Sequence, residues 1–158
     1  MTAEPSDTPN GGRGSAARLG LWFVAGFIAV LIFHQGMLGI LHGLGASPRG
    51  PYPMASTWPF GVPQVFSLAF WGGVWGIVLG LIEPRLPKGW LYWLCVILFG
   101  AILPTAVAVL VVLPLKGIQI PPGAMFAGLM VGLAINAAWG IGTALFYRLG
   151  DRLVGRGA

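Results

Sequence analysis

Four long apolar stretches, separated by short polar or proline-containing segments, dominate the pattern of hydrophobic and polar positions along the chain. The first stretch runs for 24 residues without an Asp, Glu, Lys or Arg, and as a helix it would span ~36 Å. The hydrocarbon core of a bilayer is about 30 Å thick, so stretches of this length can cross it. The pattern therefore predicts four transmembrane helices, at residues 19–42, 63–82, 90–113 and 124–147.

Helix-breaking residues separate these predicted helices. Four prolines lie in the loop 43–62, a charged turn occupies 83–89, and a second short loop occupies 114–123. Proline removes a backbone donor, so Pro104 inside the third helix should kink it. The fold class that we predict is an all-α polytopic membrane protein, with four transmembrane helices in an up-down bundle.

The two ends of the chain differ from this apolar domain. Residues 1–17 are rich in Gly, Pro, Ser and Thr and contain no apolar run, so we predict a disordered cytoplasmic tail. A cleaved signal peptide is the alternative, but its apolar part would be about 7–15 residues long. We therefore favour an uncleaved helix, one transmembrane domain over 18–148 and a short cytoplasmic tail over 149–158.

Composition supports a membrane location and explains the net charge. The chain is 56% hydrophobic and 8% charged, whereas soluble domains are about 25% charged. Seven of the nine basic residues lie in the two ends or in the turn 83–89, and only Arg49 and Lys116 lie in the other loops. This positive-inside bias predicts that both termini lie in the cytoplasm. The +5 charge is then explained without nucleic acid as a partner.

Small residues recur every four positions in the second and fourth predicted helices, and such ridges let helices approach closely in lipid. The plain interpretation is packing within one chain, and the alternative is a homo-oligomer or a membrane-protein partner. The tripeptide Trp75-Gly76-Ile77 recurs at 139–141, which suggests two parallel helical-hairpin repeats. The glycines proposed for contacts with a partner are Gly72, Gly76, Gly80, Gly128, Gly132 and Gly140.

Polar side chains at membrane depth form the candidate binding site. Polar groups are costly in lipid, so each is a functional hypothesis. Counting from the outer ends of the helices predicts a small polar pocket in the outer half around His34. The alternative is that these residues are buried and hydrogen-bond one helix to another. The candidate pocket residues are His34, Gln35, Trp71, Thr105 and Asn136.

The loop 43–62 carries aromatic side chains that favour the headgroup level of a membrane. Its prolines and rings suggest that it lies on the membrane surface as a lid over the outer end of the bundle. The predicted residues of this outer-face lid are His42, Tyr52, Trp58 and Phe60.

Three kinds of chemistry could involve these residues: haem binding, transport and catalysis. Haem needs ligands from opposite faces, but His34 and His42 would lie ~12 Å apart along one helix. His34 with Met130 is conceivable as a ligand pair, although methionine at helical spacing more often belongs to a core. A proton-coupled carrier would rely on His34 alone, because no predicted helix has an acidic residue at depth.

Enzyme chemistry has little support in the sequence. Ser67 has no second histidine on a facing helix, and the only cysteine, Cys95, excludes an intramolecular disulfide or a Cys-rich zinc site. We expect no catalytic residues, no metal and no cofactor. The predicted function is that of a non-enzymatic accessory or assembly protein. The first alternative is a small-solute or ion carrier or channel, and the second is a haem- or metal-binding membrane protein.

Three segments also carry a resemblance to a known group of proteins: FHQGMLGILHGLG, STWPFGVPQVFSLAFWGGVWGIVLGLI and NAAWGIGTALFYRLGDRL, at 33–45, 56–82 and 136–153. In these segments the chain resembles small four-helix inner-membrane proteins of proteobacteria, to which no activity is assigned. The resemblance implies location in a bacterial inner membrane and a four-helix topology, and it transfers no site residues.

Overall fold

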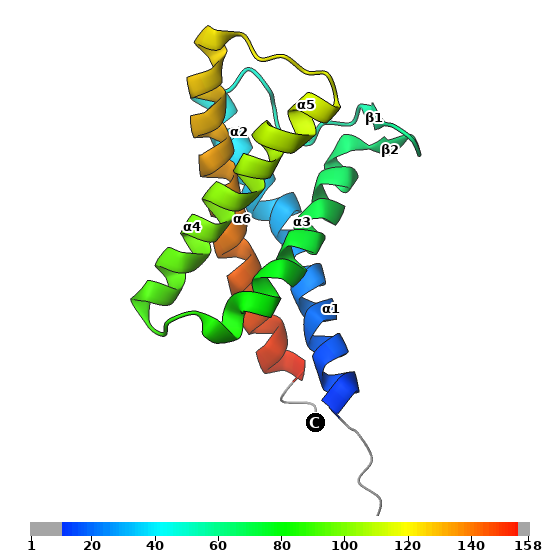
Figure 1. Ribbon diagram of the computed structural model, residues 1–158, viewed down its shortest axis with the longest axis vertical. Helices are drawn as coiled ribbons and strands as arrows, with labels where there is room; N and C mark the ends of the chain where they lie inside the picture. Colours follow the sequence, from blue (N-terminus) through cyan, green and yellow to red (C-terminus); the bar gives the residue numbers. More distant parts are fainter. Residues whose placement is uncertain (1–10, 155–158) are drawn as a thin grey trace, which may run out of the picture.

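A computed structural model describes residues 11–154 of the protein (Figure 1), and these residues are almost entirely helical. The loop after the first long helix contains a two-stranded antiparallel hairpin, in which Ser56 pairs with Pro63 and Thr57 with Val62. The elements in chain order are α1 (Gly11–Ala29), η1 (Val30–His34), α2 (Gln35–Gly43), β1 (Ser56–Thr57), β2 (Val62–Pro63), α3 (Gln64–Ile82), η2 (Glu83–Arg85), α4 (Trp90–Val107), η3 (Ala108–Val112), α5 (Leu113–Leu115) and α6 (Pro122–Val154).

Four continuous helical segments are long and apolar enough to cross a membrane. They contain 30, 22, 26 and 32 residues, and about 20 residues suffice to cross the hydrocarbon core. The prediction of an all-α protein with four membrane-spanning helices is thereby confirmed, and the protein is a multi-pass membrane protein. The four segments are Gly14–Gly43, Gln64–Arg85, Trp90–Leu115 and Pro122–Leu153.

The first and last helices extend beyond the predicted boundaries. Helix α1 begins at Gly11, so residues 11–17 are helical and not part of a disordered tail; residues 1–10 lie outside the described part of the chain. Helix α6 continues to Val154, which replaces most of the predicted C-terminal tail with helix. The backbone at Gly150 lies against the Leu21 side chain of α1, so this extension packs on the first helix.

The helices do not all contact their neighbours in sequence. Helix α1 packs between α3 and α6, and α6 packs between α1 and α4, whereas α3 and α4 share few contacts although a short turn joins them. In Figure 1, the start of α1 and the end of α6 lie at the same end of the molecule. We call this the terminal end.

Glycine brings α1 and α3 into backbone contact. A Cβ atom at Gly26 would overlap the carbonyl oxygen of Gly72, and a Cβ atom at Gly76 would overlap the carbonyl oxygen of Trp22. A carbonyl belongs to the backbone and cannot move aside, so both positions require glycine. Gly80 faces the Trp22 ring in the same interface. Three glycines that were considered for contacts with a partner (Gly72, Gly76 and Gly80) therefore pack within the chain.

The contact between α4 and α6 has the same form. A Cβ atom at Gly100 would lie 2.6 Å from the Asn136 carbonyl oxygen, and one at Gly140 would lie 2.7 Å from the Val96 carbonyl oxygen. Further along α6, the backbone at Gly132 faces Thr105 of α4. Gly140 and Gly132 therefore also pack within the chain. Of the six predicted partner glycines, Gly128 alone has no neighbour within 4 Å in the described part of the chain.

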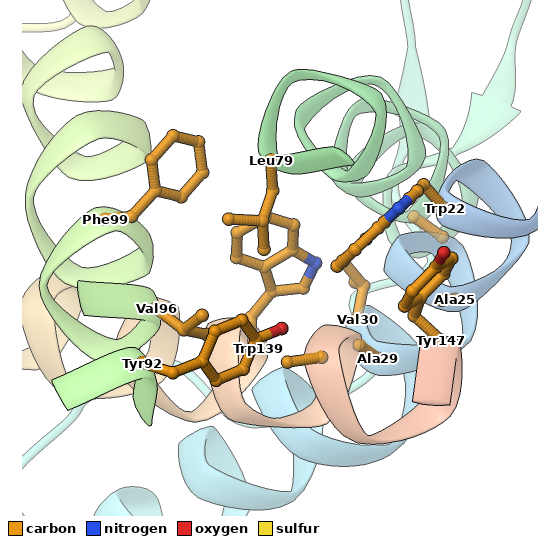
Figure 2. Close-up of a cluster of buried hydrophobic side chains, with 12 residues drawn as sticks. Trp22, Ala25, Ala29, Val30, Leu79, Tyr92, Val96, Phe99, Trp139 and Tyr147 are labelled. Carbon is orange, nitrogen blue, oxygen red and sulfur yellow. The ribbon is translucent and has the colours of Figure 1, made fainter. Parts of the chain in front are cut away.

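Aromatic side chains fill the space where α1, α3, α4 and α6 meet (Figure 2). Trp22 is fully buried and stacks on Tyr147, with ring centroids 3.8 Å apart. Trp75 of α3 contacts Phe99 of α4 edge to face, with ring centroids 6.0 Å apart, and this is one of the few contacts between these two helices. Apolar burial here gives no hydrophobic gain against lipid, so close packing of such rings supplies the stabilisation.

Two π-helical turns, η1 and η3, interrupt the first and third spanning helices. The sequence predicts a kink at Pro104. In the structure, α4 continues past Pro104 to Val107, and the π-helical turn η3 follows directly. A π-helical turn widens the helix and changes which carbonyl each amide meets, and such turns are frequent at functional sites. The turn η1 ends at His34, the first of the predicted pocket residues.

Candidate functional site

His34 and Gln35 lie side by side at the junction of η1 and α2, and both are buried. The Gln35 amide nitrogen donates to Nδ1 of His34 over 3.3 Å. A ring nitrogen that accepts a hydrogen bond carries no proton, so the proton of the neutral His34 ring lies on Nε2. The histidine is therefore oriented by its neighbour in sequence, and within residues 11–154 no hydrogen bond joins it to another helix.

Tyr52 fixes the outer loop to this junction through two hydrogen bonds. Its backbone amide donates to Oε1 of Gln35 over 2.7 Å, and its hydroxyl donates to the Leu31 carbonyl over 2.9 Å. Leu31 lies within η1, where the π-helical turn alters the usual carbonyl partners. Tyr52 has a positive φ of 55°, a conformation that costs a non-glycine residue energy and persists only when the surroundings hold it.

The start of the outer loop is fixed to the end of α2, whereas the β1–β2 hairpin extends away from the helices. His42 donates from Nδ1 to the Ser47 carbonyl over 2.9 Å, since a carbonyl oxygen can only accept. Trp58 and Phe60, at the tip of the β1–β2 hairpin, are 93% and 87% exposed. Of the four predicted lid residues, His42 and Tyr52 hold the loop in place, while Trp58 and Phe60 project from the protein.

Thr105 and Asn136 form a second polar pair, between α4 and α6. The Asn136 amide nitrogen donates to the Thr105 hydroxyl oxygen over 2.9 Å. Thr105 is 3% exposed, so an unpaired hydroxyl would be costly at this depth. Their hydrogen bond joins the same two helices that approach at Gly100 and Gly140.

Hydrogen bonds do not join the five predicted pocket residues into one network among residues 11–154. These residues divide into the pair His34–Gln35, the pair Thr105–Asn136 and Trp71, which is 58% exposed on the outer side of α3. Within residues 11–154, no hydrogen bond joins the two pairs. Sequence counting gave depth along each helix, but it did not give the rotation that turns Trp71 outward.

Sequence reasoning did not single out the polar contact of Trp139, which lies at the centre of the cluster in Figure 2. Its indole nitrogen donates to the Gly26 carbonyl over 3.0 Å, and the ring is 2% exposed. Because Gly26 and Gly72 meet at this point, one side chain of α6 joins the α1–α3 contact. The repeated tripeptide drew attention to Trp139, but only the fold shows this hydrogen bond.

Two grooves lie along the outer parts of the first helix and α6, and both are apolar. One, of about 290 Å³, is lined by Ile32, Phe33, Gly36, Met37, Ile40 and Ala138. The other, of about 510 Å³, is lined by Leu41, Ala46, Phe126, Ala127, Met130, Val131 and Ala134. None of the five predicted pocket residues lines either groove.

Metal or haem binding depends on which ligand side chains the fold brings together. Among residues 11–154, no group of three His, Cys, Asp or Glu side chains lies close enough to hold a metal ion. Met130, considered as a haem ligand with His34, lines the larger groove and is 41% exposed, whereas His34 is buried beside Gln35. The hydrogen bonds of Gln35, Thr105 and Asn136 join helices to one another or to the outer loop.

We expect Gln35→Leu to release the outer loop. The substitution removes the acceptor of the Tyr52 amide, and one such hydrogen bond is worth about 1 kcal/mol. Hydrogen exchange of the Tyr52 amide should therefore become about fivefold faster, as measured by mass spectrometry of the protein in micelles. Gln119→Leu in the exposed second loop is the matched control, and equal exchange in both variants would contradict this role of Gln35.

The fold and the polar contacts were then compared with known proteins. No family model matches the chain, and no curated protein or solved structure matches it either.

Proposed function

We propose that the protein is a non-enzymatic accessory or assembly protein of a bacterial inner membrane. The observation that carries this proposal is the use of its deep polar groups. Gln35, Asn136 and Trp139 each hydrogen-bond another part of the same chain. A group that fixes the packing of helices is not free to line a path or to act on a substrate. Stable helical packing, with few polar side chains left unpaired, suits a protein that acts by binding to other membrane proteins.

The proposed orientation places both termini in the cytoplasm. It rests on the basic residues, because Arg18, Arg85 and Arg148 lie near the terminal end whereas Arg49 lies in the outer loop. Reporter fusions test it directly: a reporter after Ala158 should be active only as a cytoplasmic fusion, and one inserted near Arg49 only as a periplasmic fusion. Activity of both on the same side would contradict this topology.

We also propose that the two hairpins, α1–α3 and α4–α6, are parallel repeats in an up-down bundle. The support is a shared contact pattern. In each hairpin a glycine of the first helix meets a carbonyl of the second, and a glycine four residues along the second helix meets a carbonyl of the first. Gly76 and Gly140 hold the same place in the two hairpins, and each is the middle residue of a Trp-Gly-Ile tripeptide.

A partner helix would have to use a surface that the chain itself leaves open. Gly128 on α6 is the predicted partner glycine that is free for such a contact within the described residues. We expect Gly128→Leu to remove at least half of the protein that co-purifies with a tagged copy or with another membrane protein after crosslinking in native membranes. Crosslinking that yields only monomer, with no other protein retained, would contradict an accessory role.

The second candidate function is a small-solute or ion carrier, and one observation favours it. His34 lies at a π-helical turn, where functional residues are often found, and its Nε2 has no hydrogen-bond partner among the described residues. Reconstitution in liposomes distinguishes the two candidates. Flux that is lost in His34→Ala and kept in His42→Ala would favour the carrier, and absence of flux together with co-purification of a partner would favour the accessory protein.

A further inference from the structure

Arg148 at the terminal end of the molecule occupies a corner formed by two aromatic rings. Its guanidinium carbon lies 4.1 Å from the centroid of the Tyr92 ring and 4.8 Å from that of the Trp93 ring. The two rings are nearly perpendicular, at 86°, with centroids 5.6 Å apart. Cation–π attraction to both rings holds the charge of α6 against the start of α4.

This corner is rigid because of what lies behind it. Tyr92 is 4% exposed and belongs to the buried aromatic cluster, so its ring cannot turn away from Arg148. Trp93 packs against the same cluster. The guanidinium is therefore already ordered, and binding by it would cost little additional side-chain entropy.

Most hydrogen-bond donors of Arg148 are not used within the described part of the chain. Stacking on a ring engages the face of a guanidinium and leaves the N–H groups in its plane free. Among residues 11–154, the Tyr92 hydroxyl is the oxygen that Arg148 approaches as a hydrogen-bond partner, and no carboxylate forms an ion pair with Arg148. An ordered fork of unpaired N–H donors has the geometry that binds a phosphate through two hydrogen bonds.

The surroundings favour an anion at this position. The described residues near the terminal end comprise two acidic side chains, Glu83 and Asp151, and five basic ones: Arg18, Arg85, Lys88, Arg148 and Arg152. Trp90 begins α4 beside this corner and is 72% exposed. An exposed tryptophan at the end of a spanning helix is typical of the headgroup level of a membrane.

We propose that Arg148, held by Tyr92 and Trp93, binds the phosphate group of an anionic phospholipid. Basic pockets between transmembrane helices recognise such headgroups. This inference does not depend on the proposed accessory role or on which side of the membrane the termini lie. It requires only that the helices span a bilayer.

The test uses the full chain purified in detergent, with lipid binding measured by native mass spectrometry. Phosphatidylglycerol and phosphatidylcholine of the same acyl chains are added in equal amounts. One arginine near a membrane surface contributes about 1 kcal/mol, so we expect about fivefold more bound phosphatidylglycerol than phosphatidylcholine. In Arg148→Gln the ratio should fall to about one.

Arg152→Gln is the matched control, because Arg152 lies one turn further along α6, is exposed and contacts no ring. It should keep the fivefold ratio. The proposal is overturned if the unmodified protein shows no preference, or if Arg152→Gln lowers the ratio as much as Arg148→Gln does. If millimolar inorganic phosphate displaces the lipid, the ligand is phosphate from solution, and the assignment to a lipid is wrong.

Arg148→Lys keeps the positive charge but lacks the fork of donors, and it provides a test if the glutamine variant does not fold. Here the ratio should fall by about twofold, because a lysine cannot make the paired hydrogen bonds. An unchanged ratio in this variant would contradict binding through the fork.

Discussion

Gly76→Ala will destabilise the protein by about 2–3 kcal/mol, although alanine favours helix more than glycine does. The added methyl group would overlap the Trp22 carbonyl oxygen, and it would approach the backbone of Gly26 as well. Because both groups belong to the backbone of α1, relief requires α1 and α3 to separate. The expected result is an earlier transition when unfolding in mixed micelles is followed by circular dichroism during titration with a denaturing detergent.

Gly128→Ala is the control for this prediction. Gly128 also lies in a spanning helix, but nothing lies within 4 Å of the position of its missing side chain. The stability of the Gly128→Ala variant should equal that of the unmodified protein or exceed it by up to about 1 kcal/mol, because alanine has a higher helix propensity than glycine. If both variants unfolded at the same detergent fraction, the close approach of α1 and α3 would not limit the stability of the protein.

Trp139→Ala should cost about 3–5 kcal/mol, the range for loss of a large buried aromatic side chain. The ring fills the centre of the buried cluster, and its indole nitrogen donates to the Gly26 carbonyl. The substitution leaves a cavity at the junction of α1, α3 and α6 and removes this hydrogen bond between α6 and α1. We expect a lower thermal transition and a protein that is partly lost from the membrane fraction during expression.

Trp71→Ala provides the comparison, because Trp71 is 58% exposed on α3 and faces away from this junction. The loss of stability in Trp71→Ala should be below about 1 kcal/mol, with a thermal transition close to that of the unmodified protein. A partial variant, Trp139→Phe, separates the two effects by keeping most of the ring while removing its hydrogen bond. Equal stability of the protein with Trp139→Ala and with Trp71→Ala would contradict the central position of Trp139.

These contacts connect the amino-acid sequence to the function that we propose. Glycine at Gly26, Gly76, Gly100 and Gly140 lets helices meet backbone to backbone, where dispersion forces are strongest. Hydrogen bonds donated by Asn136 and Trp139 then fix one arrangement of those helices, and Gln35 accepts one from the outer loop. A rigid body of this kind presents constant outer surfaces to lipid and to other proteins. The same rigidity orders Tyr92 and Trp93 around Arg148.

The sequence by itself determined that this protein has four membrane-spanning helices, because an apolar stretch of about 20 residues with few charged side chains is stable as a helix in lipid whatever its neighbours are. It also identified the small-residue ridge of α3 and the polar residues at depth. Only the tertiary structure decided which helix each ridge faces and how each helix is rotated about its axis. Trp71 and Trp139 show the difference: both are tryptophans in apolar helices, yet one faces outward and the other lies in the buried centre. Lipid is as apolar as a protein core, so hydrophobicity cannot distinguish these two faces, and close packing and paired hydrogen bonds decide between them.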